Sequence, residues 1–142
     1  MIAAPFGLRG LDHVVLRVAD LERAVAFYCN VLGCTVERRR EDLGLVHLRA
    51  GSALIDLVSL DGKSGARLGR GPEREGRNVD HFCLRVEPFD GEAIRAHLAS
   101  HGVEPGEVKP RFGAEGTGPS IYLTDPDGNG VELKGPPAVP TT

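Results

Sequence analysis

Hydrophobic and polar positions along this chain fall into two series of the same kind. The first opens with an apolar run at 11–18, after which Asp20 precedes hydrophobic residues at helical spacing that continue to Gly33. An alternation of period two predicts strands, and a period near 3.6 predicts a helix. Asp is a favourable helix N-cap, and Gly is favourable just after a helix end. Three alternating segments follow and complete a predicted β-α-β-β-β unit: 35–40, 45–50 and 53–60.

The second series repeats this order. The pair Asp12-His13 recurs as Asp80-His81, and Leu-Arg-Val follows each pair at the same distance. Such self-similarity indicates two copies of one supersecondary unit that share a core. The elements predicted for the second copy are strand 79–86, helix 90–101, weak strand 103–108 and strands 120–124 and 131–134.

Together the two series predict an α+β fold made of two tandem βαβββ modules, whose strands form a cupped mixed sheet. A single domain is expected over 8–135, with module one at 11–60, a linker at 61–78 and module two at 79–135. A basic, glycine-rich segment such as this linker is typical of a solvated connection. The glycine-rich stretch 113–118 of module two is predicted to be a loop that covers an active site.

Strand alternation separates an apolar face from a mixed one in each module, because successive side chains point to opposite faces. The apolar faces are expected to lie under the helices, and the mixed faces to line a cavity. In module one Ile55 and Leu57 are assigned to the helix side and Asp56 to the cavity. The other residues assigned to the mixed faces are His13, Arg17, His47, Arg49, His81, Cys83, Arg85, Ser120, Tyr122 and Glu132.

Two imidazoles and two carboxylates thereby fall at equivalent places in the two copies: His13, Asp56, His81 and Glu132. Mixed nitrogen and oxygen ligation suits Mn²⁺, Fe²⁺, Co²⁺, Ni²⁺ or Zn²⁺. The alternative is a set of buried histidines and acids held only by hydrogen bonds. A single His on a strand would favour that alternative, whereas repeat-equivalent pairs favour a divalent metal ion.

Composition narrows the classes of partner. The 142 residues carry a net charge of −3, which gives no electrostatic case for nucleic acid or for an acidic membrane surface. No apolar run approaches the roughly 20 residues that span a bilayer. Three cysteines without zinc-site spacing suggest reduced thiols, so a cytoplasmic location is expected.

Two stretches resemble the vicinal oxygen chelate superfamily closely. They are the segment from Leu11 to Arg23 with Ala26-Phe27-Tyr28, and the segment from Ser120 to Leu133. The superfamily includes glyoxalase I, fosfomycin-resistance proteins, methylmalonyl-CoA epimerase, extradiol dioxygenases and bleomycin-resistance proteins. The resemblance implies the glyoxalase/bleomycin resistance/dihydroxybiphenyl dioxygenase fold, with two modules around one divalent ion.

Carried over by position, the resemblance implies that His13, His81 and Glu132 are metal ligands. Asp56 stands where glyoxalase I has a fourth ligand, a Glu, so a direct ligand, a water-bridged contact and a catalytic base are all open roles. Ser120 and Tyr122 resemble the phosphonate-binding Ser and Tyr of fosfomycin-modifying members. Val15 departs from the Thr of the glutathione-transferring type, which argues against that activity.

The function expected from these residues is a metal-dependent enzyme that chelates neighbouring oxygens of a small, anionic substrate, of the glyoxalase, lyase, isomerase or fosfomycin-resistance type. Catalytic roles are expected for Asp56, His47 and Tyr122, and substrate binding for Ser120, Tyr122, Arg17, Arg85 and Arg111. The alternatives are a metal-free binding protein of the bleomycin-resistance type and an Fe²⁺-dependent extradiol dioxygenase. A homodimer is expected from the resemblance.

Overall fold

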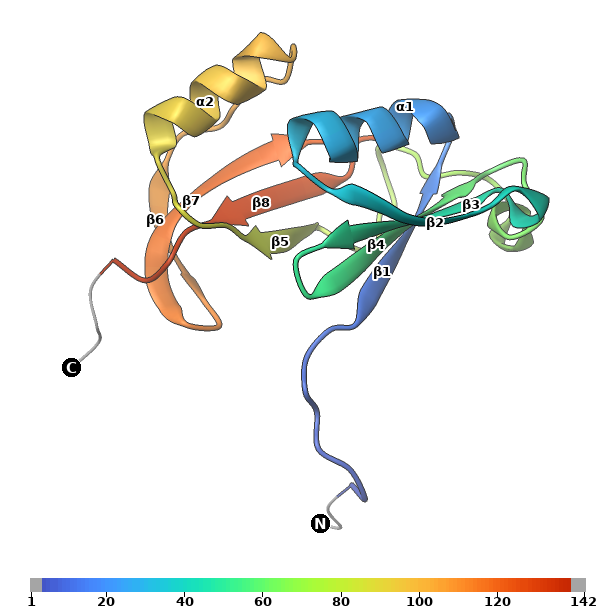
Figure 1. The fold of residues 1–142 in the computed structure, drawn as a ribbon, viewed down its shortest axis with the longest axis horizontal. Coiled ribbons are helices and arrows are strands. Elements are labelled where there is room, and N and C mark those ends of the chain that lie inside the picture. The colour runs from blue at the N-terminus through green and yellow to red at the C-terminus, as the bar shows by residue number, and fades with distance from the viewer. Residues whose placement is uncertain (1–3, 139–142) are drawn as a thin grey trace. The chain divides into compact units, whose positions relative to one another are not determined.

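The computed structural model describes residues 4–138. The chain divides into two compact units, with the boundary between Gly71 and Pro72. Each unit contains one four-stranded mixed sheet and at least one helix (Figure 1). This arrangement confirms the two predicted βαβββ modules.

The first unit has the strand order β1-β4-β3-β2. β1 and β4 are parallel, and β3 pairs antiparallel with both β4 and β2. Its elements are β1 (His13–Val18), α1 (Leu21–Ala26), η1 (Phe27–Val31), β2 (Thr35–Arg40), η2 (Glu41–Leu43), β3 (Leu45–Ala50), β4 (Ala53–Ser59) and η3 (Gly65–Leu68).

The core of the first unit lies on one face of β4. Ile55 and Leu57 are 1% and 0% exposed, as the alternation predicted for the side that packs under α1. The helix begins where the sequence indicated, because the Asp20 carboxylate accepts a hydrogen bond from the Arg23 amide. The opposite face of the strand is thereby left to Asp56.

The second unit repeats the topology, with the strand order β5-β8-β7-β6 and a parallel β5–β8 pair. Asp90 caps the helix through a hydrogen bond from the Ala93 amide, as Asp20 does in the first unit. The elements are β5 (His81–Arg85), α2 (Gly91–Ser100), β6 (Lys109–Gly113), β7 (Gly116–Thr124) and β8 (Gly130–Lys134).

Two predictions for the second unit are wrong. Residues 103–108 form no strand, and the strand of that region is β6 at Lys109–Gly113. The stretch 113–118 is no covering loop: Gly113 pairs with Gly116 and Arg111 with Gly118 in a tight β6–β7 hairpin. Glycine is required within this ladder, since a Cβ on Gly118 would lie 2.6 Å from the Pro136 carbonyl oxygen. A run of glycines has no alternation to reveal a strand.

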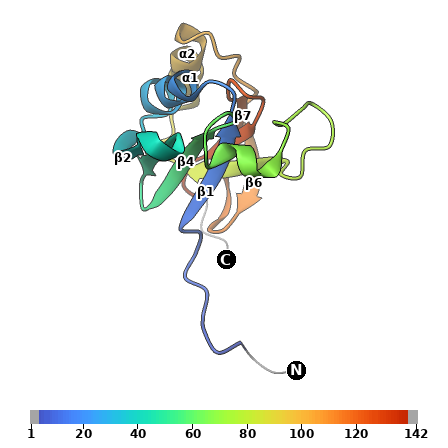
Figure 2. The ribbon, with the colours of Figure 1, turned by 90° about the vertical axis from the view of Figure 1, so that its right-hand side faces the viewer.

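The early part of the predicted linker is bound to the first unit. The Arg17 guanidinium donates hydrogen bonds to the carbonyls of Gly65, Gly69 and Arg70. Figure 2 shows this green segment, which includes η3, beside β1. Glycine at position 65 lets this segment pack closely against the end of β4, because a Cβ there would lie 1.8 Å from the Ser59 carbonyl oxygen. Among residues 4–138, no helix has the length and apolar character needed to cross a membrane.

Candidate functional site

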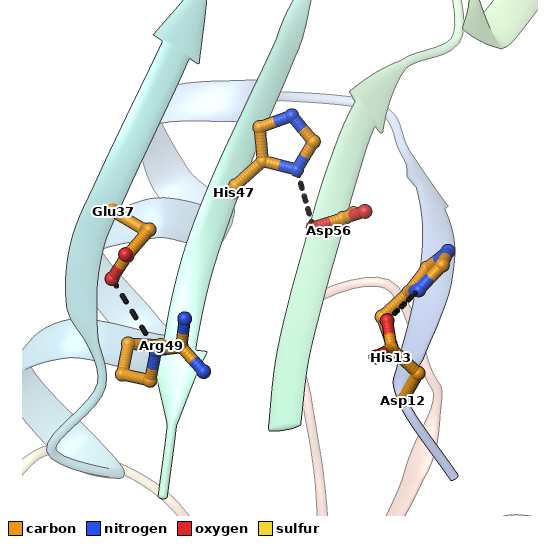
Figure 3. A network of polar contacts seen from close by, with 6 residues as sticks. All are labelled: Asp12, His13, Glu37, His47, Arg49 and Asp56. Carbon is orange, nitrogen blue, oxygen red and sulfur yellow. Dashed lines mark hydrogen bonds and ion pairs between the residues drawn. The ribbon is translucent and has the colours of Figure 1, made fainter. Parts of the chain in front are cut away.

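In the first unit, polar side chains gather on the face opposite the core (Figure 3). His47 and Asp56 are direct cross-strand partners on β3 and β4, and His47 Nδ1 lies 2.7 Å from Asp56 Oδ1. Asp56 is buried and His47 half-buried. Because a carboxylate only accepts hydrogen bonds, Nδ1 carries the proton and Nε2 is left to accept one. The first unit therefore presents an imidazole oriented by a buried acid.

His13 lies on the neighbouring strand of the same sheet. Its Nδ1 is 2.7 Å from Oδ2 of Asp12, the preceding residue (Figure 3). The hydrogen bond to Asp12 raises the pKa of His13, desolvation opposes that effect, and the negative charge of Asp56 adds to it. With Nδ1 engaged by a carboxylate, Nε2 is the ring nitrogen available to a further partner.

The second unit has the equivalent arrangement around His81. Its Nδ1 lies 2.6 Å from Oδ1 of Asp80, and its Nε2 lies 3.2 Å from Oε1 of Glu132. Glu132 is 5% exposed, and within the described residues its ion pair is with His81. Both predicted ligands of this unit are therefore in contact, whereas in the first unit the acid contacts His47 instead.

Glu132 also affects the two residues directly opposite it on the neighbouring strands, Cys83 on β5 and Tyr122 on β7. Burial, followed by the charge and hydrogen bonding of Glu132, raises the pKa of the Cys83 thiol to about 11. The pKa of Tyr122 is raised by the same causes. At neutral pH Cys83 is therefore a thiol rather than a nucleophilic thiolate, and Tyr122 keeps its proton.

Tyr122 forms the centre of a second cluster. Its ring packs edge-on against His81, with centroids 5.1 Å apart, and the Arg111 guanidinium carbon lies 4.4 Å from its centroid. Arg111 Nη1 donates to the carbonyl and the hydroxyl of Ser120, at 2.9 and 2.8 Å. The structure thus brings together three of the predicted substrate-binding residues.

The other two predicted substrate-binding arginines have partners of their own. Arg17 holds the segment 65–70, as described above. Arg85 donates to Glu115 at 2.6 Å, to Glu87 at 2.9 Å and to the Val86 carbonyl. Their binding of substrate stays a prediction, and a ligand would have to compete with these contacts.

Lys134 is a buried residue that the sequence analysis did not single out. It lies two positions after Glu132 on β8 and is 5% exposed. The strand alternation could have identified Lys134, because a residue two positions after Glu132 on the same strand shares its face.

No group of three or more His, Cys, Asp or Glu side chains is gathered into a metal-binding set within residues 4–138. In each unit, the histidine that follows an aspartate, His13 or His81, has its Nε2 available for a ligand. The neighbouring strand carries a carboxylate, Asp56 or Glu132.

Two known proteins are similar in sequence to most of this chain. A catechol-2,3-dioxygenase of Bacillus subtilis is 30% identical over 124 residues, which cover 87% of this chain and 40% of that protein. The chain thus spans less than half the length of that dioxygenase. An ethylmalonyl-CoA/methylmalonyl-CoA epimerase of Cereibacter sphaeroides is 30% identical over 131 residues, which cover 87% of this chain and 96% of the epimerase.

A solved structure and a known protein family both match most of this chain. The integron cassette protein VCH_CASS1 from the mobile metagenome of V. cholerae is 28% identical, with a TM-score of 0.71 over 92% of this chain and 97% of that one. Residues 10–133, nearly the whole chain, match one family. The chain therefore belongs to the Glyoxalase/Bleomycin resistance protein/Dioxygenase superfamily.

Proposed function

We propose that this protein is a metal-dependent enzyme in which His81 and Glu132 hold a divalent ion that binds two neighbouring oxygens of a small substrate. His13 is proposed as a ligand because it is the repeat equivalent of His81. The contact between His81 Nε2 and Glu132 Oε1, 3.2 Å, is the observation that carries the proposal. Two ligand atoms about 2.1 Å from one ion lie roughly 3 Å or slightly more apart, so this spacing fits joint ligation.

The aspartates before each histidine support the same proposal. Metal-binding histidines commonly donate their second ring N–H to a carboxylate, which fixes the tautomer and raises the basicity of the ligating nitrogen. Asp12 and Asp80 do this in both copies, even though their own side chains are 91% and 95% exposed. A purely structural histidine would not require the same exposed partner twice.

The bound ion would act as a Lewis acid toward charge that develops on the chelated oxygens. The residues of the chain supply proton transfer and orientation. His47 would accept a proton at Nε2 while Asp56 holds Nδ1 and stabilises the imidazolium. Tyr122, protonated at neutral pH, would donate a hydrogen bond to the substrate, and Arg111 would neutralise its charge.

Metal analysis of the purified chain tests the proposal. Wild-type protein is expected to bind one tightly held divalent ion per set of ligands, and His81→Ala is expected to bind none. His101→Ala, which alters a histidine outside the site, is the matched control. Undiminished metal binding by His81→Ala would show that His81 is not a ligand, and no tight binding by the wild type would leave a metal-free binding protein as the function.

The reaction can then be sought with substrates of the relatives. Methylmalonyl-CoA, catechol with added Fe²⁺ and the hemithioacetal of methylglyoxal and glutathione represent three reaction classes of the superfamily. Turnover that requires both the ion and His47 would identify the class.

Replacing Asp80 with asparagine is expected to lower the affinity for the ion by about 10- to 100-fold, because the carboxylate no longer increases the basicity of His81. The affinity is measured by competition with a chelating dye. Asp42→Asn, which removes an exposed acid paired with Arg40, is the charge-matched control. Equal affinities in the two variants would contradict a supporting role for Asp80.

A further inference from the structure

The turn between β7 and β8 is organised around one buried carboxylate. Asp125 is 4% exposed, and its side chain accepts hydrogen bonds from the backbone amides of Asp127 and Asn129, at 2.9 and 2.8 Å. It also accepts one from the Asn129 side-chain amide, at 2.8 Å. Asp side chains commonly stabilise turns through such bonds to nearby amides. β8 begins at the next residue, Gly130, and carries Glu132, so this turn sets where the strand of Glu132 starts.

Arg77, a half-buried residue near the end of the predicted linker, binds to this turn. Its Nη1 donates a hydrogen bond to Asn129 Oδ1 at 3.2 Å, and its Nη2 donates one to the Asp127 carbonyl oxygen at 2.6 Å. Gly128 lies against the guanidinium, because a Cβ there would be 2.6 Å from Arg77 Nη2. Glycine at this position therefore leaves the space that the arginine occupies, and the last part of the linker is bound to the second unit.

Arg77 and the turn lie just before the two strands that carry the candidate metal ligands of this unit. β5 begins at His81 and pairs in parallel with β8, with His81 opposite Gly130. A Cβ on Gly130 would lie 2.7 Å from the Asp80 carbonyl oxygen and 3.0 Å from His81 Cβ, so the two strands approach closely at their first residues. Glu132 lies two positions further along β8, which makes its contact with His81 a diagonal one. A diagonal contact depends on how the two strand starts are aligned.

No tight turn fixes that alignment. Helix α2 and the β6–β7 hairpin lie between β5 and β8 along the chain, and parallel strands require such a long connection. The two hydrogen bonds of Arg77 instead join the segment before β5 directly to the turn before β8.

We infer that Arg77 is a positioning residue for His81 and Glu132, which it holds at their spacing of 3.2 Å between Nε2 and Oε1 by joining the starts of their strands. The planar guanidinium suits this role, because its fixed fork of donors reaches two acceptors at once, whereas an ammonium is a single point charge. In this role Arg77 touches neither the ion nor the substrate. The inference rests on the proposed function, since it concerns the spacing of two proposed ligands.

Titration of the full chain with Co²⁺, in competition with a chelating dye, tests the inference. Arg77→Gln is expected to lower the affinity for the ion by about tenfold, because the two ligands are no longer held at the spacing for joint ligation. The visible absorption of bound Co²⁺ depends on ligand geometry and should change in the same variant. Arg74→Gln, which removes an exposed arginine of the same linker, is the charge-matched control and should stay within about twofold of the wild type.

A general loss of stability is separated from the positioning role by measuring all affinities well below the unfolding temperature of the metal-free variants. Arg77→Lys keeps the charge but reaches one acceptor, so its affinity is expected to lie between those of Arg77→Gln and the wild type. It carries the test if Arg77→Gln does not fold. Wild-type affinity and absorption in every Arg77 variant that folds would overturn the inference.

Failure of the proposed function has a different signature, namely that the wild type binds no ion. The ring resonances of His81, recorded by NMR on metal-free protein, then report on its contact with Glu132. A change in Arg77→Gln but not in Arg74→Gln supports the positioning role without any metal. Unchanged His81 resonances in Arg77→Gln contradict it.

Discussion

Glutamine in place of Glu132 is expected to lower the affinity for a divalent ion by more than about 100-fold, whereas asparagine in place of Asp56 should change it less than about threefold. The two acids occupy equivalent positions in the two units, directly opposite Tyr122 and His47. Their partners differ, however. Glu132 contacts the Nε2 of a histidine whose other nitrogen is already held, and Asp56 holds the Nδ1 of His47.

Asp56 is expected to contribute to catalysis rather than to metal affinity. Asp56→Asn should leave the ion bound but reduce kcat, because the amide stabilises an imidazolium at His47 less well than a carboxylate does. Both variants keep the shape of the side chain, so thermal unfolding should be nearly unchanged. Metal titration and turnover are measured on the same preparations. A loss of metal in Asp56→Asn as large as in Glu132→Gln would make Asp56 a ligand, as the position of the fourth ligand in glyoxalase I implies.

The second large effect concerns stability. Leu57→Ala is expected to lower the free energy of unfolding by about 2 to 5 kcal/mol, because it removes a side chain that is 0% exposed in the middle of β4. Neighbouring strands pair with β4 on both sides, so the backbone has little freedom to close the cavity.

Urea denaturation followed by circular dichroism measures this change. Val36→Ala is the matched control, since Val36 lies 45% exposed on the edge strand β2. That substitution should cost less than about 1 kcal/mol. A similar loss in both variants would mean that the face of Ile55 and Leu57 is not the core of the first unit.

The sequence anticipated most of the fold, because its elements repeat. Asp20 and Asp90 mark both helix starts, and the alternation around Ile55 and Leu57 places the core correctly. The errors lie where alternation is absent. In 113–118 the glycines form strand pairs through their backbones alone, and no side-chain pattern reports such pairing.

The sequence by itself determined which residues share a face. A period of two fixes His47 with Arg49, Ser120 with Tyr122, and Lys134 with Glu132, whatever the strands pair with. The tertiary structure decided which of these side chains meet. Strand register sets His47 against Asp56, and rotamers direct Arg17 to the segment 65–70 and Arg111 to Ser120. These contacts depend on strand register and on side-chain rotamers, which local periodicity does not encode.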